Sequence, residues 1–396
     1  MAATTAGTTS HAEVEVRSRI ERLLEHDPSD AEVFLGAQYD LGLAWVHFPE
    51  GAGGLGADRE LQRLVHEAVV ASGVEQPRYG IGYGMAAPTI AECGTDEQRA
   101  RWLRPLFTGQ EIWCQLFSEP GAGSDVAGLA TRAVRDGDEW VVNGQKVWTS
   151  GAHRSRWGLL VTRTDPDAPK HRGLTYFAVD MDQPGIEIRP LRQITGQAEF
   201  NEVYLTDARV AEADRMGDVG EGWRVSLTTL MNERVAIGGT TTSTDKGAVG
   251  WMVEAWDRYG HDDPTRRDEL MRLWVRGRVL RLNNLRAEQA RETGTPGPEG
   301  SIGKVLSADF NKDAFSFALG LTGMDGTLFE AGYTMDQTRP EFEYDTLAEY
   351  FLRVRANSIE GGTTEVMRNI LGERVLGLPG DVRTDKDMAW KDVPRN

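Results

Sequence analysis

The chain has 396 residues, of which 40% are hydrophobic, including 11 tryptophans. A chain of this length is expected to fold as two or three lobes with ample apolar material for their cores. Its 61 Asp and Glu residues outnumber its 44 Lys and Arg residues, and the net charge of −17 argues against a nucleic-acid partner or a surface for anionic membranes.

The cysteine count and the apolar runs exclude several further classes. Only Cys93 and Cys114 occur, which excludes a disulfide framework and a cysteine-based metal site and agrees with a reducing compartment. No apolar run approaches the roughly 20 residues of a membrane span. The first ten residues are small and polar, and Glu13 and Glu15 follow them, so neither a signal peptide nor a mitochondrial presequence is predicted. We therefore expect a soluble, cytoplasmic protein without a metal site.

Helical patterns dominate the N-terminal part of the chain. Apolar residues recur at helical spacing from Ala12 to Glu25, and a second helix is expected from Asp58 to Val70. The stretch from Met85 to Phe107 predicts two short helices, separated by a break and N-cap at Gly94–Gln98. Together these patterns predict a helical domain over residues 1–115.

A glycine run from Gly51 to Gly56 matches the G-x-G-x-x-G pattern of a dinucleotide-binding turn. Pro49-Glu50 separates this run from the apolar stretch before it, and the Glu50 carboxylate would repel a pyrophosphate. No convincing second strand follows the next helix. We therefore interpret the run as a proline and glycine turn within the helical domain.

The pattern changes to period two between Ala130 and Val210, which indicates a small antiparallel barrel or sandwich. Asn143-Gly144 supplies the residue pair of a type I′ turn, so a hairpin is predicted between Trp140–Val142 and Lys146–Thr149. This region is assigned as a middle β domain of residues 116–220. The other predicted strands are Ala130–Val134, Gly158–Thr162, Thr175–Val179, Ile186–Pro190 and Glu202–Leu205.

Helical periodicity returns at Gly222 and predicts a helical bundle over residues 221–396. The final polar segment, Arg383–Asn396, is interpreted as an arm. The expected helices are Trp223–Arg258, Thr265–Thr293, Gly300–Leu319, Thr346–Ala356 and Thr364–Leu376.

A small-residue loop from Ser118 to Asp125 precedes the predicted hairpin. Gly121 and Gly123 allow its backbone to approach a flat or phosphate-bearing ligand. The strand that ends at Trp148-Thr149-Ser150 places an aromatic face beside short hydroxyls, which suits a conjugated ring system.

The blocks Ser118–Asp125 and Asn143–Ala152 resemble the two signature blocks of the acyl-CoA dehydrogenase family of flavoproteins, and Pro88–Leu103 resembles a third block. The resemblance extends to Arg374–Pro379 and therefore covers nearly the whole chain. It implies an α+β fold that is mostly helical, with an N-terminal helical domain, a middle antiparallel β-barrel and a C-terminal helical bundle. FAD is the implied cofactor.

The resemblance also implies which residues contact the cofactor. Ser118 stands where the family hydrogen-bonds the flavin, and Ser124 where it contacts flavin and CoA. Trp148 and Ser150 would flank the ring, with backbone from Thr149 between them. The full set of implied cofactor contacts is Leu116, Phe117, Ser118, Gly123, Ser124, Trp148, Thr149, Ser150, Thr363 and Glu365.

Dehydrogenation of a thioester requires a carboxylate that takes the α proton, and the sequence offers two candidates. The family places this base before an Arg in the first C-terminal helix, which Glu233-Arg234 resembles, or in a loop directly before Gly-Thr. Alignment on Gly362-Thr363 puts Gly361 at the position of the loop base and leaves Glu360 one residue early. Glu233 is therefore favoured, with Glu360 as the alternative; Ser124, Arg234 and Gly361 would contact the acyl-CoA.

The implied function is oxidation of an acyl-CoA to the trans-2-enoyl-CoA, with electrons passed to an electron-transfer flavoprotein, by a homotetramer or homodimer. Two rival functions stay open. One is a flavin monooxygenase or nitroalkane-oxidase relative. The other is a non-catalytic partner subunit of a heteromer, because Trp256–Gly260 and Leu319–Gly326 match the family's adenine-side motifs poorly.

Overall fold

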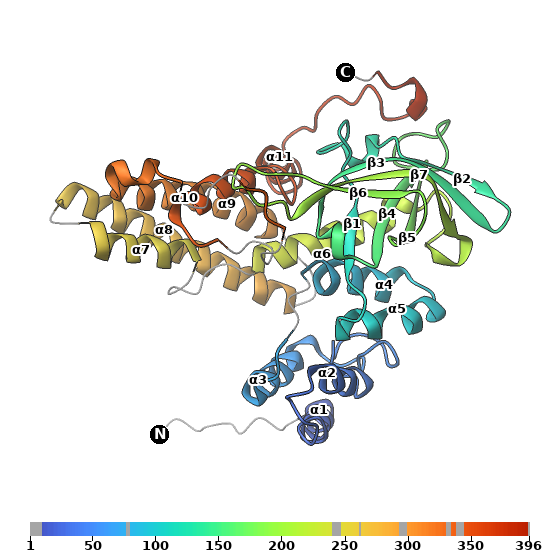
Figure 1. Ribbon diagram of the computed structural model, residues 1–396, viewed down its shortest axis with the longest axis horizontal. Coiled ribbons are helices and arrows are strands. Elements are labelled where there is room, and N and C mark those ends of the chain that lie inside the picture. The colour runs from blue at the N-terminus through green and yellow to red at the C-terminus, as the bar shows by residue number, and fades with distance from the viewer. Residues whose placement is uncertain are drawn as a thin grey trace. The chain divides into compact units, whose positions relative to one another are not determined.

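The computed structural model describes residues 10–76, 80–239, 247–260, 263–292, 299–329, 334–337 and 344–394. The chain divides into two compact units, residues 1–113 and 114–396. The second unit contains both the predicted middle domain and the predicted C-terminal domain (Figure 1). None of the described helices is long and apolar enough to cross a lipid bilayer.

The first unit is helical, as the sequence predicts. Its first helix begins after Ser10, whose hydroxyl accepts a hydrogen bond from the Glu13 amide. Thr95 and Gln98 form a reciprocal capping box at the predicted break between two short helices. The α-helices are α1 (His11–Leu23), α2 (Ala31–Asp40), α3 (Gln62–Ser72), α4 (Ala87–Cys93) and α5 (Asp96–Thr108).

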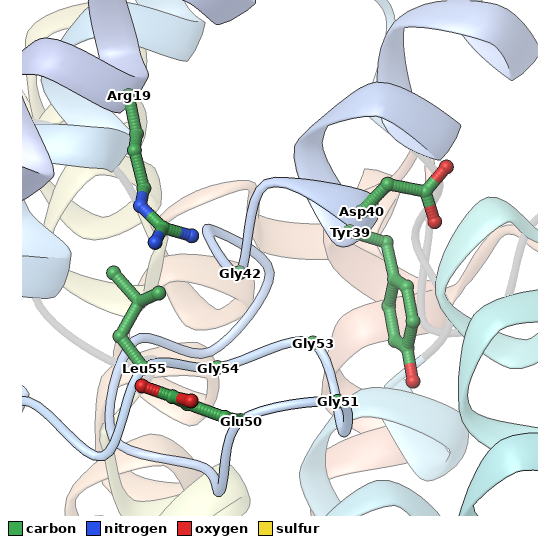
Figure 2. Close-up of a pocket in the computed structure, with 9 residues that line it drawn as sticks. All are labelled: Arg19, Tyr39, Asp40, Gly42, Glu50, Gly51, Gly53, Gly54 and Leu55. Atoms are coloured by element: carbon green, nitrogen blue, oxygen red, sulfur yellow. The ribbon is translucent and has the colours of Figure 1, made fainter.

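The glycine run lies in a turn of this helical unit (Figure 2). Gly51, Gly53 and Gly56 all have positive φ, and a Cβ on Gly54 would lie 2.2 Å from the Phe48 carbonyl oxygen. Glycine is therefore required by the turn itself. Glu50 and Arg19 border the same hollow of about 350 Å³. The described part of this unit places helices on both sides of the turn, so the dinucleotide-binding interpretation is rejected, as expected.

The second unit contains an eight-stranded sheet with the order β6-β7-β3-β2-β4-β5-β8, and β1 pairs with β4. The β2–β3, β3–β7, β4–β5, β5–β8 and β6–β7 pairs are antiparallel, whereas Arg132 of β2 and Arg163 of β4 make a parallel contact. The sheet is therefore mixed at that point, within the predicted β domain. The strands are β1 (Trp113–Leu116), β2 (Arg132–Asp136), β3 (Glu139–Ser150), β4 (Trp157–Arg163), β5 (Leu174–Asp180), β6 (Ile186–Pro190), β7 (Phe200–Ala211) and β8 (Arg215–Met216).

The predicted hairpin at Asn143-Gly144 is wrong. Both residues lie inside β3, and the hairpin turn lies instead at Gly137, whose φ is +65°, between paired Asp136 and Glu139. The Asn143 side chain exchanges hydrogen bonds with Asp207, at an irregularity where β7 carries one residue more than β3. Gly144 is needed for packing, because a Cβ there would lie 2.3 Å from Thr131 Oγ1. The irregular pairing with β7 and the close packing at Gly144 thus explain why an Asn-Gly dipeptide occurs inside a strand.

A second irregularity of β3 follows four residues later. From Lys146 to Thr149, opposite Val203 to Asn201, β3 carries one residue more than β7. Within this bulge Trp148 has a φ of 59°, a left-handed conformation that costs a residue with a side chain roughly 1–3 kcal/mol. Such strain marks a candidate functional position.

Helices dominate the remainder of the unit. The range predicted as one helix from Trp223 to Arg258 contains two, α6 and α7, and residues 240–246 between them lie outside the described residues. Buried Val249, Leu273, Phe310 and Phe317 join α7, α8 and α9 in one core. The helices are α6 (Gly222–Gly239), α7 (Gly247–Tyr259), α8 (Pro264–Glu292), α9 (Glu299–Leu321), α10 (Leu347–Arg353) and α11 (Thr364–Arg374).

Unit 1 contains a histidine whose titration should affect its stability. Burial, followed by the nearby Arg59 charge, lowers the pKa of His47 to about 4. Below pH 6.5 the unfolded chain therefore binds a proton that the folded chain excludes, so stability should fall as the pH drops from 6.5 towards 4. We expect the wild-type protein to lose roughly 1–2 kcal/mol more than His47→Gln between these pH values, allowing for partial exposure.

Urea unfolding at pH 7 and pH 5, followed by a probe in unit 1, measures this difference. The same substitution at exposed His66 on α3 is the control. Equal pH slopes for wild type and His47→Gln would contradict the prediction.

Candidate functional site

The loop after β1 is held against the middle of β3. The Val147 amide donates to the Ser118 carbonyl oxygen at 2.9 Å, and Glu119 and Ala122 exchange two backbone hydrogen bonds. Gly123 and Ser124 beyond them are exposed. The predicted loop and the predicted strand end are therefore neighbours.

The glycines of this loop face open space. A Cβ built on Gly121 or Gly123 would meet no atom of the described residues within 4 Å, and neither residue is among the glycines with positive φ. Neither packing against the described residues nor the backbone conformation requires glycine at these positions. The free space in front of the backbone is what a closely approaching ligand would need.

A buried ion pair anchors the loop from below. Lys146 is 0% exposed, and its Nζ donates to the Glu119 carboxylate at 2.9 Å and to the Phe117 carbonyl at 3.1 Å. The Glu119 carboxylate also accepts from the amides of Ala130 and Thr131. Complete burial lowers the pKa of Lys146, and Glu119 opposes that shift. Burial would raise the pKa of Glu119, but Lys146 and the hydrogen bonds lower it overall.

The end of β3 presents the three predicted ring contacts in different ways. Trp148 is 59% exposed, and its ring meets Phe200 edge to face at 5.8 Å. The Thr149 hydroxyl is buried and has no hydrogen-bond partner in the part of the chain that the structure describes. The Thr149 carbonyl accepts from Asn201, and half-buried Ser150 pairs with Phe200.

Two predicted cofactor residues have side chains that face the core. Leu116 is fully buried in the sheet core, and the buried Phe117 ring packs edge to face on Tyr176 at 5.8 Å. Only their backbones remain for a ligand. The Phe117 carbonyl is already an acceptor for Lys146.

Glu233 lies on α6 and reaches the sheet. Gln115 of β1 donates its Nε2 to the half-buried Glu233 carboxylate at 3.3 Å. The helix packs closely on β5 at its start, since a Cβ on Gly222 would lie 2.6 Å from the Thr175 amide nitrogen. One turn before Glu233, the hydroxyls of Thr229 and Tyr176 share a hydrogen bond of 2.9 Å, which also joins the helix to β5. The Arg234 side chain lies outside the described residues.

Glu360 is engaged in a different way. Its two carboxylate oxygens accept from Arg353 at 3.1 and 2.7 Å, and Asn357 donates a further hydrogen bond of 2.6 Å. Arg353 is 7% exposed; burial opposes its charge, but Glu360 outweighs this effect and raises the pKa of Arg353 overall. The Glu360 carboxylate therefore neutralises a buried guanidinium.

The segment after Glu360 begins α11. Gly361 and Gly362 have positive φ, so the chain turns sharply there. The Thr363 hydroxyl accepts from the Val366 amide at 3.2 Å and so caps its own helix, while Glu365 is exposed in the first turn. Backbone amides of this helix start stay available to an anion.

A polar chain joins this region to the end of β3. The Gly151 amide donates to the Glu199 carbonyl at 2.8 Å, and the Tyr344 hydroxyl donates to the Glu199 carboxylate at 3.4 Å. Tyr344 also interacts with Arg353, the partner of Glu360. Sequence reasoning missed Glu199 and Tyr344, because nothing in their spacing shows that they meet.

Comparison with known proteins assigns the family. Residues 5–110 match the family model of the acyl-CoA dehydrogenase N-terminal domain, residues 114–208 that of the middle domain, and residues 220–376 that of the C-terminal domain. The acyl-CoA dehydrogenase IpdE1 of Mycobacterium tuberculosis is 37% identical over 86% of both chains. The chain belongs to the acyl-CoA dehydrogenase family. It is therefore an oxidoreductase of a flavoprotein family, as the signature blocks predict.

Other relatives agree in sequence and in structure. The acyl-CoA dehydrogenase FadE34 of M. tuberculosis is 41% identical over 86% of this chain, which spans 45% of the length of FadE34. The structure named Tcur3481-Tcur3483 steroid ACAD is similar with a TM-score of 0.71, at 26% identity and 94% coverage of both chains. The ChsE4-ChsE5 complex from M. tuberculosis gives a TM-score of 0.70 at 26% identity, covering 96% of this chain and 100% of that chain.

The residues of this acyl-CoA dehydrogenase fit a flavin. An unpartnered hydroxyl at Thr149 and open space before Gly121 and Gly123 are suited to a polar, flat group. On α9, the Lys304 amine is 6% exposed and has no hydrogen-bond partner among the described residues. Burial lowers its pKa, although the charges of Glu360 and Glu365 oppose this. Sequence analysis assigned Lys304 no role, and such an amine suits a phosphate.

The described residues contain no group of three or more His, Cys, Asp or Glu side chains arranged to hold a metal ion. The features of the site are therefore hydroxyls, backbone amides, carboxylates and buried amines. Groups of these kinds can bind and orient an organic ligand, and carboxylates can transfer protons.

The buried Glu119–Lys146 pair should contribute strongly to the free energy of unfolding of the protein. Replacement Glu119→Gln would leave the Lys146 ammonium buried without its carboxylate, and we expect this to cost about 3–5 kcal/mol in the free energy of unfolding. Chemical denaturation of the full chain measures the loss.

The control is Asp167→Asn, which breaks the exposed ion pair between Asp167 and Lys391 and should cost less than about 1 kcal/mol. If Glu119→Gln costs no more than this control, the pair does not have the role assigned to it.

Proposed function

We propose that this protein is an FAD-dependent acyl-CoA dehydrogenase that oxidises an acyl-CoA thioester to the trans-2-enoyl-CoA, with Glu233 as the catalytic base. The observation that carries the proposal is the different engagement of the two candidate carboxylates. The Glu233 carboxylate accepts a hydrogen bond from the neutral amide of Gln115, whereas the Glu360 carboxylate is bound at both oxygens by a buried guanidinium and also by an amide. A proton on Glu360 would disrupt that ion pair, so Glu360 is suited to structure and Glu233 to proton transfer.

The protein residues have separate roles in this reaction. The Glu233 carboxylate takes the α proton of the thioester, and Gln115 orients the carboxylate through its amide. A flavin held by Ser118, Trp148 and Thr149 would supply a hydride acceptor for the β hydrogen, which balances the proton taken by Glu233 and leaves the carbon–carbon double bond. The backbone amide near Gly361 donates to the thioester carbonyl and stabilises the charge that develops on its oxygen.

Different parts of unit 2 would hold the cofactor. Ser118, Trp148, Thr149 and Ser150 would contact the ring, supported by the strain and exposure of Trp148 and by the unpartnered Thr149 hydroxyl. On the helical side, Thr363 and Glu365 at the start of α11 would contact phosphate or ribityl groups. The nearby Lys304 amine would supply a positive charge for the phosphates.

The remaining binding roles concern the substrate and the acceptor. Ser124 and Arg234 would contact the acyl-CoA, and an electron-transfer flavoprotein would receive the electrons from the reduced enzyme. A homotetramer or homodimer is the expected assembly. A heteromeric dehydrogenase for a bulky, steroid-type acyl-CoA is the second candidate, because two similar structures are named as a steroid ACAD pair and a two-protein complex.

An absorption spectrum and an anaerobic titration test the proposal directly. The purified protein should show bound flavin, and one class within a panel of straight, branched and polycyclic acyl-CoA thioesters should bleach it. Bleaching only after addition of a second, different subunit would support the heteromer. Rapid oxidation of the reduced protein by oxygen, without bleaching by any thioester, would favour the monooxygenase or nitroalkane-oxidase relative instead.

The base assignment has its own test. Glu233→Gln should retain bound flavin but lose bleaching by about 10²-fold or more in rate, because the α proton then has no acceptor. The matched control is Glu360→Gln, which should keep the bleaching rate within a few fold while lowering stability by about 3 kcal/mol, since Arg353 then lies buried without its carboxylate. Normal bleaching in Glu233→Gln together with its loss in Glu360→Gln would transfer the role to the loop.

A further inference from the structure

The C-terminal arm of this chain folds back onto the sheet. Beyond residue 376, where the match to the C-terminal domain model ends, the chain leaves α11 and reaches the sheet (Figure 1). Ala389 bridges Pro169, and the amides of Trp390 and Lys391 donate to carbonyls of the connection between β4 and β5 at 2.9 and 3.1 Å. The predicted polar arm is therefore a docked part of unit 2.

One residue of the arm contacts the segment that directly follows the loop Ser118–Asp125. The Trp390 indole nitrogen donates to the Gly128 carbonyl at 3.1 Å. The Arg163 guanidinium lies over the Trp390 ring at 4.6 Å from its centroid. Arg163 is 2% exposed and donates to the Ala127 carbonyl at 2.6 Å. Trp390 thus covers the arginine that binds the segment after Asp125.

A second residue of the arm reaches the loop through a lysine. Lys170 Nζ lies 2.8 Å from the Asp385 carboxylate and 2.9 Å from the Asp125 carboxylate. Lys170 is only 17% exposed, so the two carboxylates share a largely enclosed cation. Asp125 is the last residue of the loop that begins at Ser118, directly after the exposed Ser124.

These contacts divide the support of the loop into two halves. The first half is fixed by the Glu119–Lys146 pair and the Ser118–Val147 hydrogen bond. From Ser124 to Leu129, the side chains of Arg163, Lys170 and Trp390 donate hydrogen bonds to the segment, and Ala127 and Leu129 are buried. The arm supplies one of these three side chains and a carboxylate partner for another.

We propose that the C-terminal arm is a strap that orders residues 124–129, with Trp390 and Asp385 as positioning residues for Ser124 at the acyl-CoA and flavin site. The role assigned to Ser124 rests on the proposed function, whereas the ordering of the loop does not. Loss of the two arm contacts leaves the first half of the loop fixed and weakens the support of the second half, because Arg163 loses the ring that covers it and Lys170 loses its second carboxylate. The enzyme then binds substrate less tightly, because each binding event must first order the loop.

Hydrogen exchange of the purified holoenzyme tests the strap in the double variant Asp385→Asn/Trp390→Ala. Amides of residues 124–129 should exchange about tenfold faster than in wild type, while amides of β7 keep their rates and show that the sheet is folded. Lys391→Ala is the control, because Lys391 lies on the same arm but pairs with Asp167 outside the loop. Unchanged exchange at 124–129 in the double variant would overturn the proposal.

Kinetics connect the strap to the site. In the double variant, KM for the best acyl-CoA should rise about fivefold or more while kcat changes less than twofold. Trp390→Phe keeps a ring for Arg163 but loses the indole donor, so its KM should lie between those of wild type and the double variant. A fall in kcat at unchanged KM would overturn the positioning role. If wild type binds no flavin and oxidises no thioester, the proposed function fails, and the exchange result still decides whether the arm orders the loop.

Discussion

The buried ion pair between Glu119 and Lys146 is the constraint on which the candidate site depends. A lysine with no exposed surface is stable only if its charge is met, and here the carboxylate that meets it belongs to the loop after β1. Lys146 of β3 therefore holds the loop through Glu119. Because the same carboxylate accepts two backbone amides at residues 130 and 131, one charged cluster fixes the first half of the loop and the residues directly after Leu129.

The second buried pair distinguishes the surroundings of the two candidate carboxylates. Arg353 requires a partner inside the helical part of unit 2, and Glu360 supplies it in bidentate geometry. Through Tyr344 and Glu199 this pair is linked to the end of β3, so the loop before α11 and the strand edge are held by one polar network. Glu233 lies on α6, which is hydrogen-bonded to β5 and β1.

The sequence predicts most elements but not the contacts between them. Periodicity and caps such as Thr95–Gln98 locate helices because they are local, and the signature blocks identify the family. Asn143-Gly144 misled the prediction because a dipeptide that suits a tight turn also suits a crowded strand opposite a bulge. Gln115 and Trp390 could not be recognised, since their hydrogen-bond partners are distant in the chain, and Lys304 could not, since its burial arises only when the chain is folded. The roles of Glu233 as the base and of Trp148 as a ring contact stay predictions.

The extra residue in β3 has a consequence for the two faces of the sheet. In a regular strand, residues two apart point to the same side, so Lys146 and Trp148 would share one environment. The bulge shifts the alternation by one residue, and the same short segment can therefore place a charge in the interior and an indole in solvent. A single extra residue thus lets one short segment of β3 have a buried lysine and an exposed indole, and its backbone strain is the energetic cost of that arrangement.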